Sequence, residues 1–273
     1  MRVIEQEEIQ PLLLNILDAF HTYCETNSLV YFLSDGTLLG AVRHHGFIPW
    51  DDDIDVSMID DQYDKLIELA KGEPFLDKEK RYRFLLPSEL PNFYPFVKVI
   101  DTQTIAYEKD IDRKYAIGLW LDIFRLSHCD SDFSITQHKY KRIKRLRELN
   151  KLAVCGNFRT PTYKKIAPLI NIGKALLNTI GISPITLSRK IQEIERQMPK
   201  QGARVMDITW ADSVNHYFDA SLWLKTTSLD FCGKQFYAPE KYEEVLTSQF
   251  GNYMRLPPEK DRIRHDFEAY FLN

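Results

Sequence analysis

A run of aspartates carries the clearest capacity for chemistry in this chain. Within "PWDDDIDVSM" (49–58), four of the five residues from 51 to 55 are aspartates. Side chains alternate between the two faces of a strand, so Asp53 and Asp55 share one face and Ile54 lies on the other. The sequence therefore predicts a strand that buries its apolar side and presents two carboxylates together on the opposite side.

Two carboxylates held about 4 Å apart repel each other by roughly 4 kcal/mol at an effective dielectric constant of about 20. A divalent cation offsets this repulsion, and hard oxygen ligands suit Mg²⁺ or Mn²⁺. A solvated acidic turn is the competing interpretation, but the period-two apolar spacing and the neighbouring Pro49 and Trp50 favour a packed strand. A calcium-binding EF-hand loop is excluded, because it requires Gly and Glu where this chain has Val56 and Gln62.

A third carboxylate, Asp122, stands alone among apolar residues in "LWLDIF" (119–124). Strand alternation gives Asp122 and Phe124 one face. A lone aspartate on a core strand needs a partner, because burying an unpaired charge is costly. A metal shared with Asp53 and Asp55 would supply that partner, and so would a salt bridge to an arginine.

The segment "SDGTLLGAVRHHG" (34–46) precedes the aspartates and supplies complementary groups. A strand that ends at Ser34 and opens into a helix presents backbone N–H groups and a positive helix end, an arrangement that binds phosphate. Arg43 can bind a phosphate with both branches of its guanidinium, or it can interact with the helix C-terminus. His44 and His45 add cationic or donor groups. The P-loop and dinucleotide fingerprints are absent.

Apolar periodicity predicts the elements that position these groups. In the first part of the chain, helical spacing and capping signals predict helices over 6–27, 36–46 and 60–71. Short apolar runs bounded by turn residues predict strands around one sheet, at 29–33, 54–58, 81–86, 94–100, 104–108 and 119–124.

The later part of the chain has a different pattern. We predict helices over 131–153, over 162–181 with a break near Pro168, over 183–198 with Ser183 as N-cap, and over 239–250. Strand-like pieces at 204–210 and 228–237, the latter with a turn at Gly233, complete the pattern. The predicted organisation is a catalytic core over 1–130, a helical insertion over 131–200 that faces a membrane or the acceptor, and a C-terminal segment over 201–273 that packs on the core.

The composition of the chain limits the classes of protein to which it can belong. The 273 residues are 44% hydrophobic with a net charge of −3, which is typical of a globular protein and does not indicate a nucleic-acid binder. The four scattered cysteines indicate reduced core thiols. With no signal-like apolar core at the start and no long apolar run, we expect a cytoplasmic protein, peripheral at the inner face of the plasma membrane.

A basic segment and an apolar segment lie near each other in the predicted insertion. "HKYKRIKRLR" (138–147) holds six Lys or Arg residues, and the stretch 166–180 is apolar. The basic segment is typical of a solvated helix face. It is also suited to contact with an anionic membrane surface or a phosphate-bearing acceptor.

The block "LSDGTLLGAVRHHGFIPWDDDIDVSM" (33–58) strongly resembles the LicD family of phosphotransferases, which is related to fukutin and fukutin-related protein. Three other segments are similar to the family: "YPFVKV" (94–99), "GLWLDIF" (118–124) and "FYAPEKYEEVLTSQFGNYMRLPP" (236–258). The resemblance implies an α+β fold with a nucleotidyltransferase-like mixed sheet flanked by helices, and a helical insertion. In that fold the catalytic and metal-binding carboxylates would be Asp53, Asp55 and Asp122.

The best-known LicD members transfer phosphocholine from CDP-choline to a glycan of teichoic acid or lipopolysaccharide, and relatives use CDP-ribitol or CDP-glycerol. By resemblance, the cofactor would be Mg²⁺ or Mn²⁺, Asp122 would be the general base, and the acceptor would be a lipid-linked glycan. The residues expected to bind substrate are Ser34, Gly36, Thr37, Arg43, His44 and Lys98. Aromatic side chains would bind the quaternary ammonium of choline, with Tyr94, Phe96, Trp120, Trp210 and Tyr217 as candidates.

Two other functions stay open on the sequence. The same fold could serve a nucleotidyltransferase that moves NMP to a small molecule or a protein. A metal-binding adaptor with a dead site is the non-enzymatic alternative, and the presence of all three expected carboxylates disfavours it.

Overall fold

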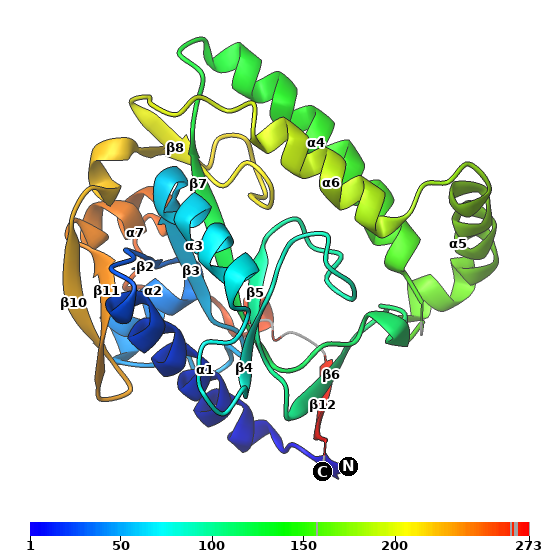
Figure 1. Ribbon diagram of the computed structural model, residues 1–273, viewed down its shortest axis with the longest axis horizontal. Helices are drawn as coiled ribbons and strands as arrows, with labels where there is room; N and C mark the ends of the chain where they lie inside the picture. The colour runs from blue at the N-terminus through cyan, green and yellow to red at the C-terminus, as the bar shows by residue number, and fades with distance from the viewer. Residues whose placement is uncertain (157, 263, 265–266, 273) are drawn as a thin grey trace.

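The computed structural model describes residues 1–156, 158–262, 264 and 267–272. Within that part of the chain, a seven-stranded mixed sheet forms the centre of the fold, with helices around it (Figure 1). Its main path is β2 (Phe32–Leu33), β3 (Asp55–Ile59), β7 (Trp120–His128), β5 (Val97–Asp101) and β4 (Tyr82–Leu85). Two more strands, β8 (Arg204–Met206) and β9 (Phe218–Asp219), extend from the end of β7.

The register of the three central strands determines which side chains stand together. The strands β3 and β7 are parallel and place Asp55 opposite Asp122, while the antiparallel pair β5 and β7 places Lys98 opposite the same Asp122. Residues directly opposite each other in a sheet point to the same face. The side chains of Asp55, Asp122 and Lys98 therefore form one row across the sheet.

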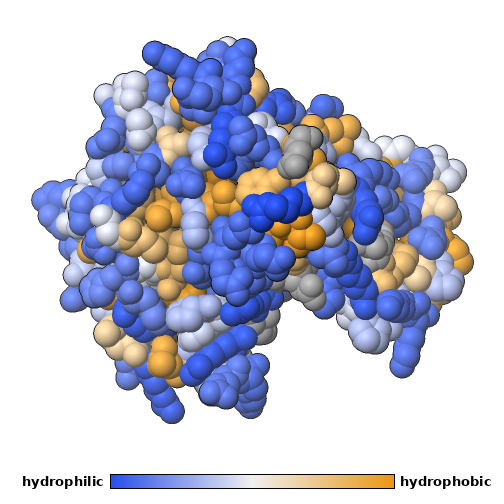
Figure 2. Space-filling view, turned by 90° about the horizontal axis from the view of Figure 1, so that it is seen from below, coloured by the Kyte–Doolittle hydropathy of each residue, from blue (hydrophilic) through white to orange (hydrophobic). Residues whose placement is uncertain are grey.

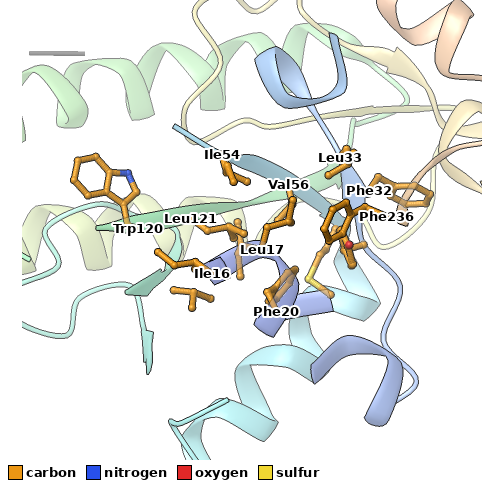
Figure 3. Close-up of a cluster of buried hydrophobic side chains, with 14 of the residues drawn as sticks. Ile16, Leu17, Phe20, Phe32, Leu33, Ile54, Val56, Trp120, Leu121 and Phe236 are labelled. Atoms are coloured by element: carbon orange, nitrogen blue, oxygen red, sulfur yellow. The ribbon is translucent and has the colours of Figure 1, made fainter. Parts of the chain in front are cut away.

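The opposite face of these strands packs into the hydrophobic core. Ile54, Val56 and Leu121 are fully buried in one cluster with residues of α1 (Gln6–Thr26), as Figure 3 shows. The predicted sorting of apolar and acidic residues along 53–56 is confirmed. Ile16 and Leu17 of α1 lie against this face, so the N-terminal helix covers the side of the sheet away from the carboxylates.

The other elements of the core surround this sheet. The predicted helices over 36–46 and 60–71 correspond to α2 (Asp35–His44) and α3 (Asp60–Gly72). A hairpin of β10 (Thr226–Phe231) and β11 (Lys234–Pro239) turns at Gly233, as predicted, where the backbone adopts φ 77°. The remaining pieces are α7 (Tyr242–Phe250) and the short 3₁₀ turns η1 (Arg113–Tyr115), η2 (Ala220–Trp223) and η3 (Glu259–Asp261).

One strand does not join the predicted single sheet. β6 (Thr104–Glu108) pairs with β12 (Phe267–Phe271), which in turn pairs with β1 (Arg2–Val3). Both edges of β5 are already taken by β4 and β7, so the strand that follows it must find another partner. The two ends of the chain consequently meet beside β6 (Figure 1).

Three helices fill the predicted insertion: α4 (Phe133–Val154), α5 (Pro161–Thr179) and α6 (Pro184–Glu195). Figure 1 shows α4 and α6 side by side and α5 projecting from the end of α4. The predicted break of α5 near Pro168 is wrong, because the helix continues through it. Pro168 lies on the exposed side, where water can satisfy the carbonyl that loses its N–H partner.

The strand predicted over 204–210 is shorter than expected. It ends at Met206 because the side chain of Asp207 accepts hydrogen bonds from the backbone N–H groups of Thr209 and Trp210, which turns the chain. Period-two patterning alone could not separate this turn from a continuing strand.

Candidate active site

A cavity of about 740 Å³ opens beside the row of charged side chains. Residues far apart in the sequence line it, from α2, the aspartate segment, β5, β7, the 207–212 turn and α7. The predicted residues Asp53, Asp55, Asp122, Ser34, Gly36 and Lys98 are all among them. The alternating residues Trp120, Asp122, Phe124 and Leu126 of β7 face the cavity, as strand alternation predicted for Asp122 and Phe124.

Lys98 is the partner that Asp122 requires. Its ammonium lies 2.5 Å from Oδ1 of Asp122, and its side chain is only 1% exposed. The same ammonium lies 4.2 Å from the ring centre of Tyr94 and 4.7 Å from that of Trp120. Asp122 therefore forms a salt bridge, as the competing interpretation predicted. Its partner is a lysine and not the predicted arginine.

The aspartate side chains raise one another's pKa at this cavity. Burial, followed by repulsion from Asp53, Asp35 and Asp122, raises the pKa of Asp55 well above its usual value. Burial also raises the pKa of Asp122 to about 6, although the ammonium of Lys98 opposes that change. The charged form of Asp55 is therefore held beside other carboxylates at a cost in free energy, whereas Lys98 supplies a counter-charge to Asp122.

Asp35 and Asp51 line the same cavity and were not predicted as site residues. Asp35 adopts a left-handed backbone conformation with φ 47° at the start of α2, and its side chain accepts a hydrogen bond from Gln249. A Cβ atom on Gly36 would lie 2.6 Å from Oδ2 of Asp51, so glycine allows this carboxylate to approach the helix start. The Ser-Asp-Gly turn was recognisable in sequence, but the contact with Gln249 was not.

Three predicted substrate-binding residues do not line the cavity. The Thr37 hydroxyl accepts a hydrogen bond from the backbone N–H of Asp55, which fixes the start of β3 against α2. Arg43 donates to the backbone carbonyl of Tyr253, and His44 packs edge-on against Trp50. The structure therefore gives these three side chains contacts within the protein, and their role in substrate binding stays a prediction.

Two cavity-lining residues hold buried polar atoms that make no hydrogen bond within the described part of the chain. They are Oγ of Ser34 and Nε1 of Trp223. A buried donor without a partner loses its hydration at a cost of about 1–3 kcal/mol. Both atoms are therefore suited to donate to a bound ligand, and Trp223, which lies in η2, had no distinguishing signal in the sequence.

Aromatic rings form another part of the lining. Tyr94, Phe96 and Trp210 pack together, with the centre of the Trp210 ring 5.3 Å from each of the other two ring centres. The hydroxyl of Tyr94 donates to Glu108 at 2.6 Å, and Glu108 also lines the cavity. Of the five aromatic candidates from the sequence, only Tyr217 lies elsewhere, against Phe133.

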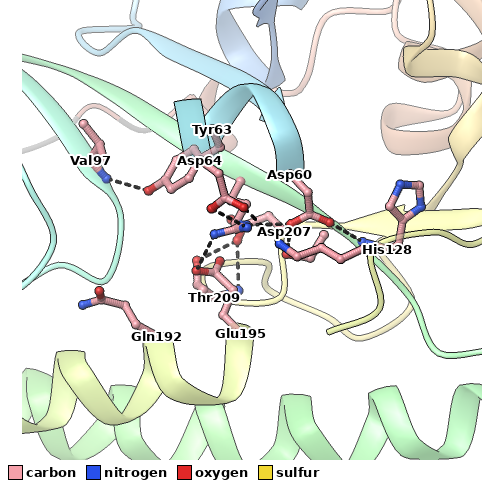
Figure 4. A network of polar contacts seen from close by, with 12 residues as sticks. Asp60, Tyr63, Asp64, Val97, His128, Gln192, Glu195, Asp207 and Thr209 are labelled. Atoms are coloured by element: carbon pink, nitrogen blue, oxygen red, sulfur yellow. Dashed lines mark hydrogen bonds and ion pairs between the residues drawn. The ribbon is translucent and has the colours of Figure 1, made fainter. Parts of the chain in front are cut away.

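An ion-pair network lies behind the cavity and joins β7 to α3 and α6 (Figure 4). Arg125 of β7 binds Asp60 at 2.6 Å and Asp64 at 2.8 Å, and its guanidinium lies 4.0 Å from Glu195 of α6. Burial raises the pKa of Glu195 to about 8, because Arg125 compensates only part of the cost. The network connects α6 of the insertion to β7, the strand that carries Asp122.

The described residues contain no group of three His, Cys, Asp or Glu side chains arranged closely enough to hold a metal ion. The predicted ligands Asp53, Asp55 and Asp122 line one cavity without forming a ready-made cage. Mg²⁺ commonly binds one or two protein carboxylates and completes its coordination with substrate phosphates and water. The chemistry of these donors and their mutual repulsion therefore fit a cation that binds together with a phosphorylated substrate.

The comparisons with known proteins match the region that contains the aspartates. A family model described as LicD/FKTN/FKRP, nucleotidyltransferase domain, matches residues 28–91. The chain is 29% identical to the lipopolysaccharide cholinephosphotransferase LicD of Haemophilus influenzae over 282 aligned positions, which cover 100% of both chains.

Shorter matches link the chain to two uncharacterised proteins. It is 38% identical over 58 residues to one from Rickettsia typhi, which covers 21% of this chain and 18% of the relative. It is 49% identical over 39 residues to one from Rickettsia prowazekii, with 14% and 15% covered. The predicted resemblance is confirmed: residues 28–91 match the LicD/FKTN/FKRP nucleotidyltransferase-domain model, and the chain is similar to LicD over its full length.

Proposed function

We propose that this protein is a metal-dependent enzyme that transfers phosphocholine from CDP-choline to a hydroxyl group of a cell-surface glycan precursor, either lipopolysaccharide or teichoic acid. The observation that carries the proposal is the composition of the cavity. Carboxylates, one buried ammonium, two unpartnered donors and aromatic rings line a single space of about 740 Å³. The full-length similarity to a lipopolysaccharide cholinephosphotransferase supports the choice of reaction.

The acidic part of the cavity would act on the pyrophosphate of the donor. Asp53 and Asp55, with Asp122, are the residues that would hold Mg²⁺ or Mn²⁺. When bound, the ion supplies positive charge that stabilises the attacking and leaving oxygens of a phosphoryl transfer. Ser34 and Trp223 would donate hydrogen bonds to the donor; Nε1 of Trp223 makes no hydrogen bond within the described residues.

The transfer itself replaces one phosphorus–oxygen bond with another. A sugar hydroxyl attacks the phosphorus that carries choline, the bond from this phosphorus to the bridging oxygen breaks, and CMP leaves. The Asp122 carboxylate accepts the proton of the attacking hydroxyl. Lys98 orients that carboxylate through their contact of 2.5 Å.

The aromatic part of the cavity suits the choline group. A quaternary ammonium has no N–H to donate, so it is recognised by aromatic faces and by negative charge nearby. Trp210 supplies a ring and Glu108 supplies a carboxylate to the lining of the cavity, and the Tyr94 hydroxyl holds Glu108 in place. A donor with a ribitol or glycerol group would place hydroxyls against this ring and bind less tightly.

The decisive experiment uses CDP-choline labelled separately in the choline and in the cytidine. With lipopolysaccharide or teichoic acid precursor as acceptor and Mg²⁺ present, the choline label should move to the glycan and the cytidine label should appear in CMP. Transfer of the cytidine label to any acceptor would identify a nucleotidyltransferase instead. Binding of CDP-choline without turnover on either acceptor would contradict the proposed reaction, and Asp53→Asn is the control for catalysis at this cavity.

A further inference from the structure

The apolar side of helix α5 is wider than the part of it that packs on the protein. Ile170 and Leu177 are buried, and Leu177 packs with residues of α4 and α6. A helix that presents one apolar face to the protein normally carries polar residues on the other side. In α5 the far side is polar, with exposed Lys164, Asn171 and Asn178, but the apolar side extends beyond the residues that pack on the protein.

The part of the apolar side next to the packed residues is exposed. Leu169, Ile172 and Leu176 are 69%, 58% and 63% exposed, and Ile180, directly after the helix, is 68% exposed. Their spacing of three, four and four residues places them along one side of the helix. Figure 1 shows α5 projecting from the rest of the molecule, and apolar surface is visible on the corresponding right-hand lobe in Figure 2. The stripe Leu169–Ile172–Leu176–Ile180 is therefore open to an external partner.

All charged residues of α5 are positive. The sequence of α5 contains three lysines and no aspartate or glutamate. Lys164 and Lys165 are exposed near its start, and Lys165 is in line with the stripe, four residues before Leu169. The exposed residues of the neighbouring α4 include Lys141, Arg142, Lys144 and Arg145, together with Glu148, which pairs with Lys151. This combination of apolar stripe and basic surroundings is complementary to anionic lipid headgroups over an apolar interior.

We propose that α5 lies in the surface of an anionic membrane, with the stripe inserted among the lipid chains and Lys164 and Lys165 at the headgroups. This inference stands on the geometry of α5 and does not depend on the reaction proposed above. It gives the insertion a defined lipid contact and fixes which end of the molecule faces the membrane.

The arrangement supports a helix that lies on the membrane and does not cross it. Among the described residues, no single helix is long and apolar enough to span a membrane, and only the bent pair of α5 and α6, at 71°, passes a test of length and composition. The apolar residues Leu187, Ile191 and Ile194 of α6 are buried within the protein. The apolar surface available to lipid is thus that of α5.

Vesicle co-sedimentation of the full chain tests the proposal. The probe is vesicles of phosphatidylcholine, with and without phosphatidylglycerol, at low and high salt. The test variant is Leu169→Glu/Leu176→Glu, whose positions are exposed, so the fold should persist and circular dichroism checks it. The matched control is Leu90→Glu/Leu224→Glu, because these leucines are also 65% and 76% exposed but lie elsewhere.

The wild-type chain should bind vesicles that contain phosphatidylglycerol, and high salt should weaken this binding. The test variant should bind about tenfold less or weaker still, and Lys164→Glu/Lys165→Glu should also reduce binding, while the control double variant should bind like wild type. Failure of the wild type to bind, or equal binding by the test variant, would overturn the proposal. So would a wild-type dimer in light scattering that the test variant converts to a monomer, since that result would assign the stripe to a second copy of the chain.

Discussion

The ammonium of Lys98 lies 2.5 Å from the carboxylate of Asp122, and the two residues stand directly opposite each other on β5 and β7. The pair is almost fully enclosed, and three aromatic rings surround the lysine within 4.2–5.2 Å of their centres. A lysine held in this way has little freedom to move. The positive charge of Lys98 is therefore held in one place, and its contact with Oδ1 fixes the orientation of the Asp122 carboxylate.

Replacing Lys98 with methionine should destabilise the protein by about 3–5 kcal/mol near neutral pH, because Asp122 is left buried and uncompensated. The loss should shrink as pH falls, because removal of Lys98 raises the pKa of Asp122 further and the carboxyl then takes up a proton. Chemical denaturation at several pH values measures this difference. The double variant Lys98→Met/Asp122→Asn should recover most of the stability, and a double variant as unstable as the single one would contradict the pairing.

Asp55→Asn should separate stability from activity. Because burial and the neighbouring carboxylates raise the pKa of Asp55, removal of its charge should leave the metal-free protein as stable as wild type or up to about 1 kcal/mol more stable. Turnover should fall by roughly 10³-fold, because the site loses one of the carboxylates that would hold the metal ion. Thermal unfolding and the labelled-donor assay give the two results, and near-normal turnover would remove Asp55 from the catalytic set.

Trp223→Phe removes a buried N–H that makes no hydrogen bond within the described residues. We expect the KM for CDP-choline to rise about tenfold, since one hydrogen bond to a charged ligand contributes roughly 1.5–3 kcal/mol. Stability should stay within about 1 kcal/mol of wild type, because the lost donor had no partner in the free protein. An unchanged KM would show that Nε1 does not contact the donor.

Glu195→Gln should change how stability depends on pH. The pKa of Glu195 is about 8 in the folded protein, above its usual value of 4.5, so the folded state binds the extra proton between these pH values. Stability from this group is therefore lost as pH rises from about 4.5 to 8. The glutamine variant should lose less stability over that range, by roughly 1–3 kcal/mol. Parallel pH–stability curves for the two proteins would contradict the assignment.

Much of the site could be predicted because it depends on local alternation. Asp122 faces the cavity and Ile54 faces the core, since period two is a property of any strand. The partner of Asp122 could not be chosen from sequence, because it depends on the pairing register of β5 and β7. Trp223 was missed for a similar reason, since η2 reaches the cavity only through the tertiary fold.

The fold shows the same division. Capping signals predicted α6 from Ser183, whose hydroxyl accepts from the backbone N–H of Thr186. They did not predict that β6 would leave the main sheet, because that outcome depends on both edges of β5 being taken. The domain boundaries, the metal and the cellular location stay predictions.

The register between β3 and β7 has a consequence for ligands of this protein. A shift of one residue would turn Asp55 or Asp122 to the opposite face, so the row of charges exists only when strands distant in sequence are correctly paired. A non-reactive analogue of the donor would therefore bind the native pairing and ignore slipped or unfolded chains. Such a compound would act as a pharmacological chaperone, raising the ratio of correctly folded to unfolded protein by the factor 1 + c/Kd, where c is the free concentration of the compound.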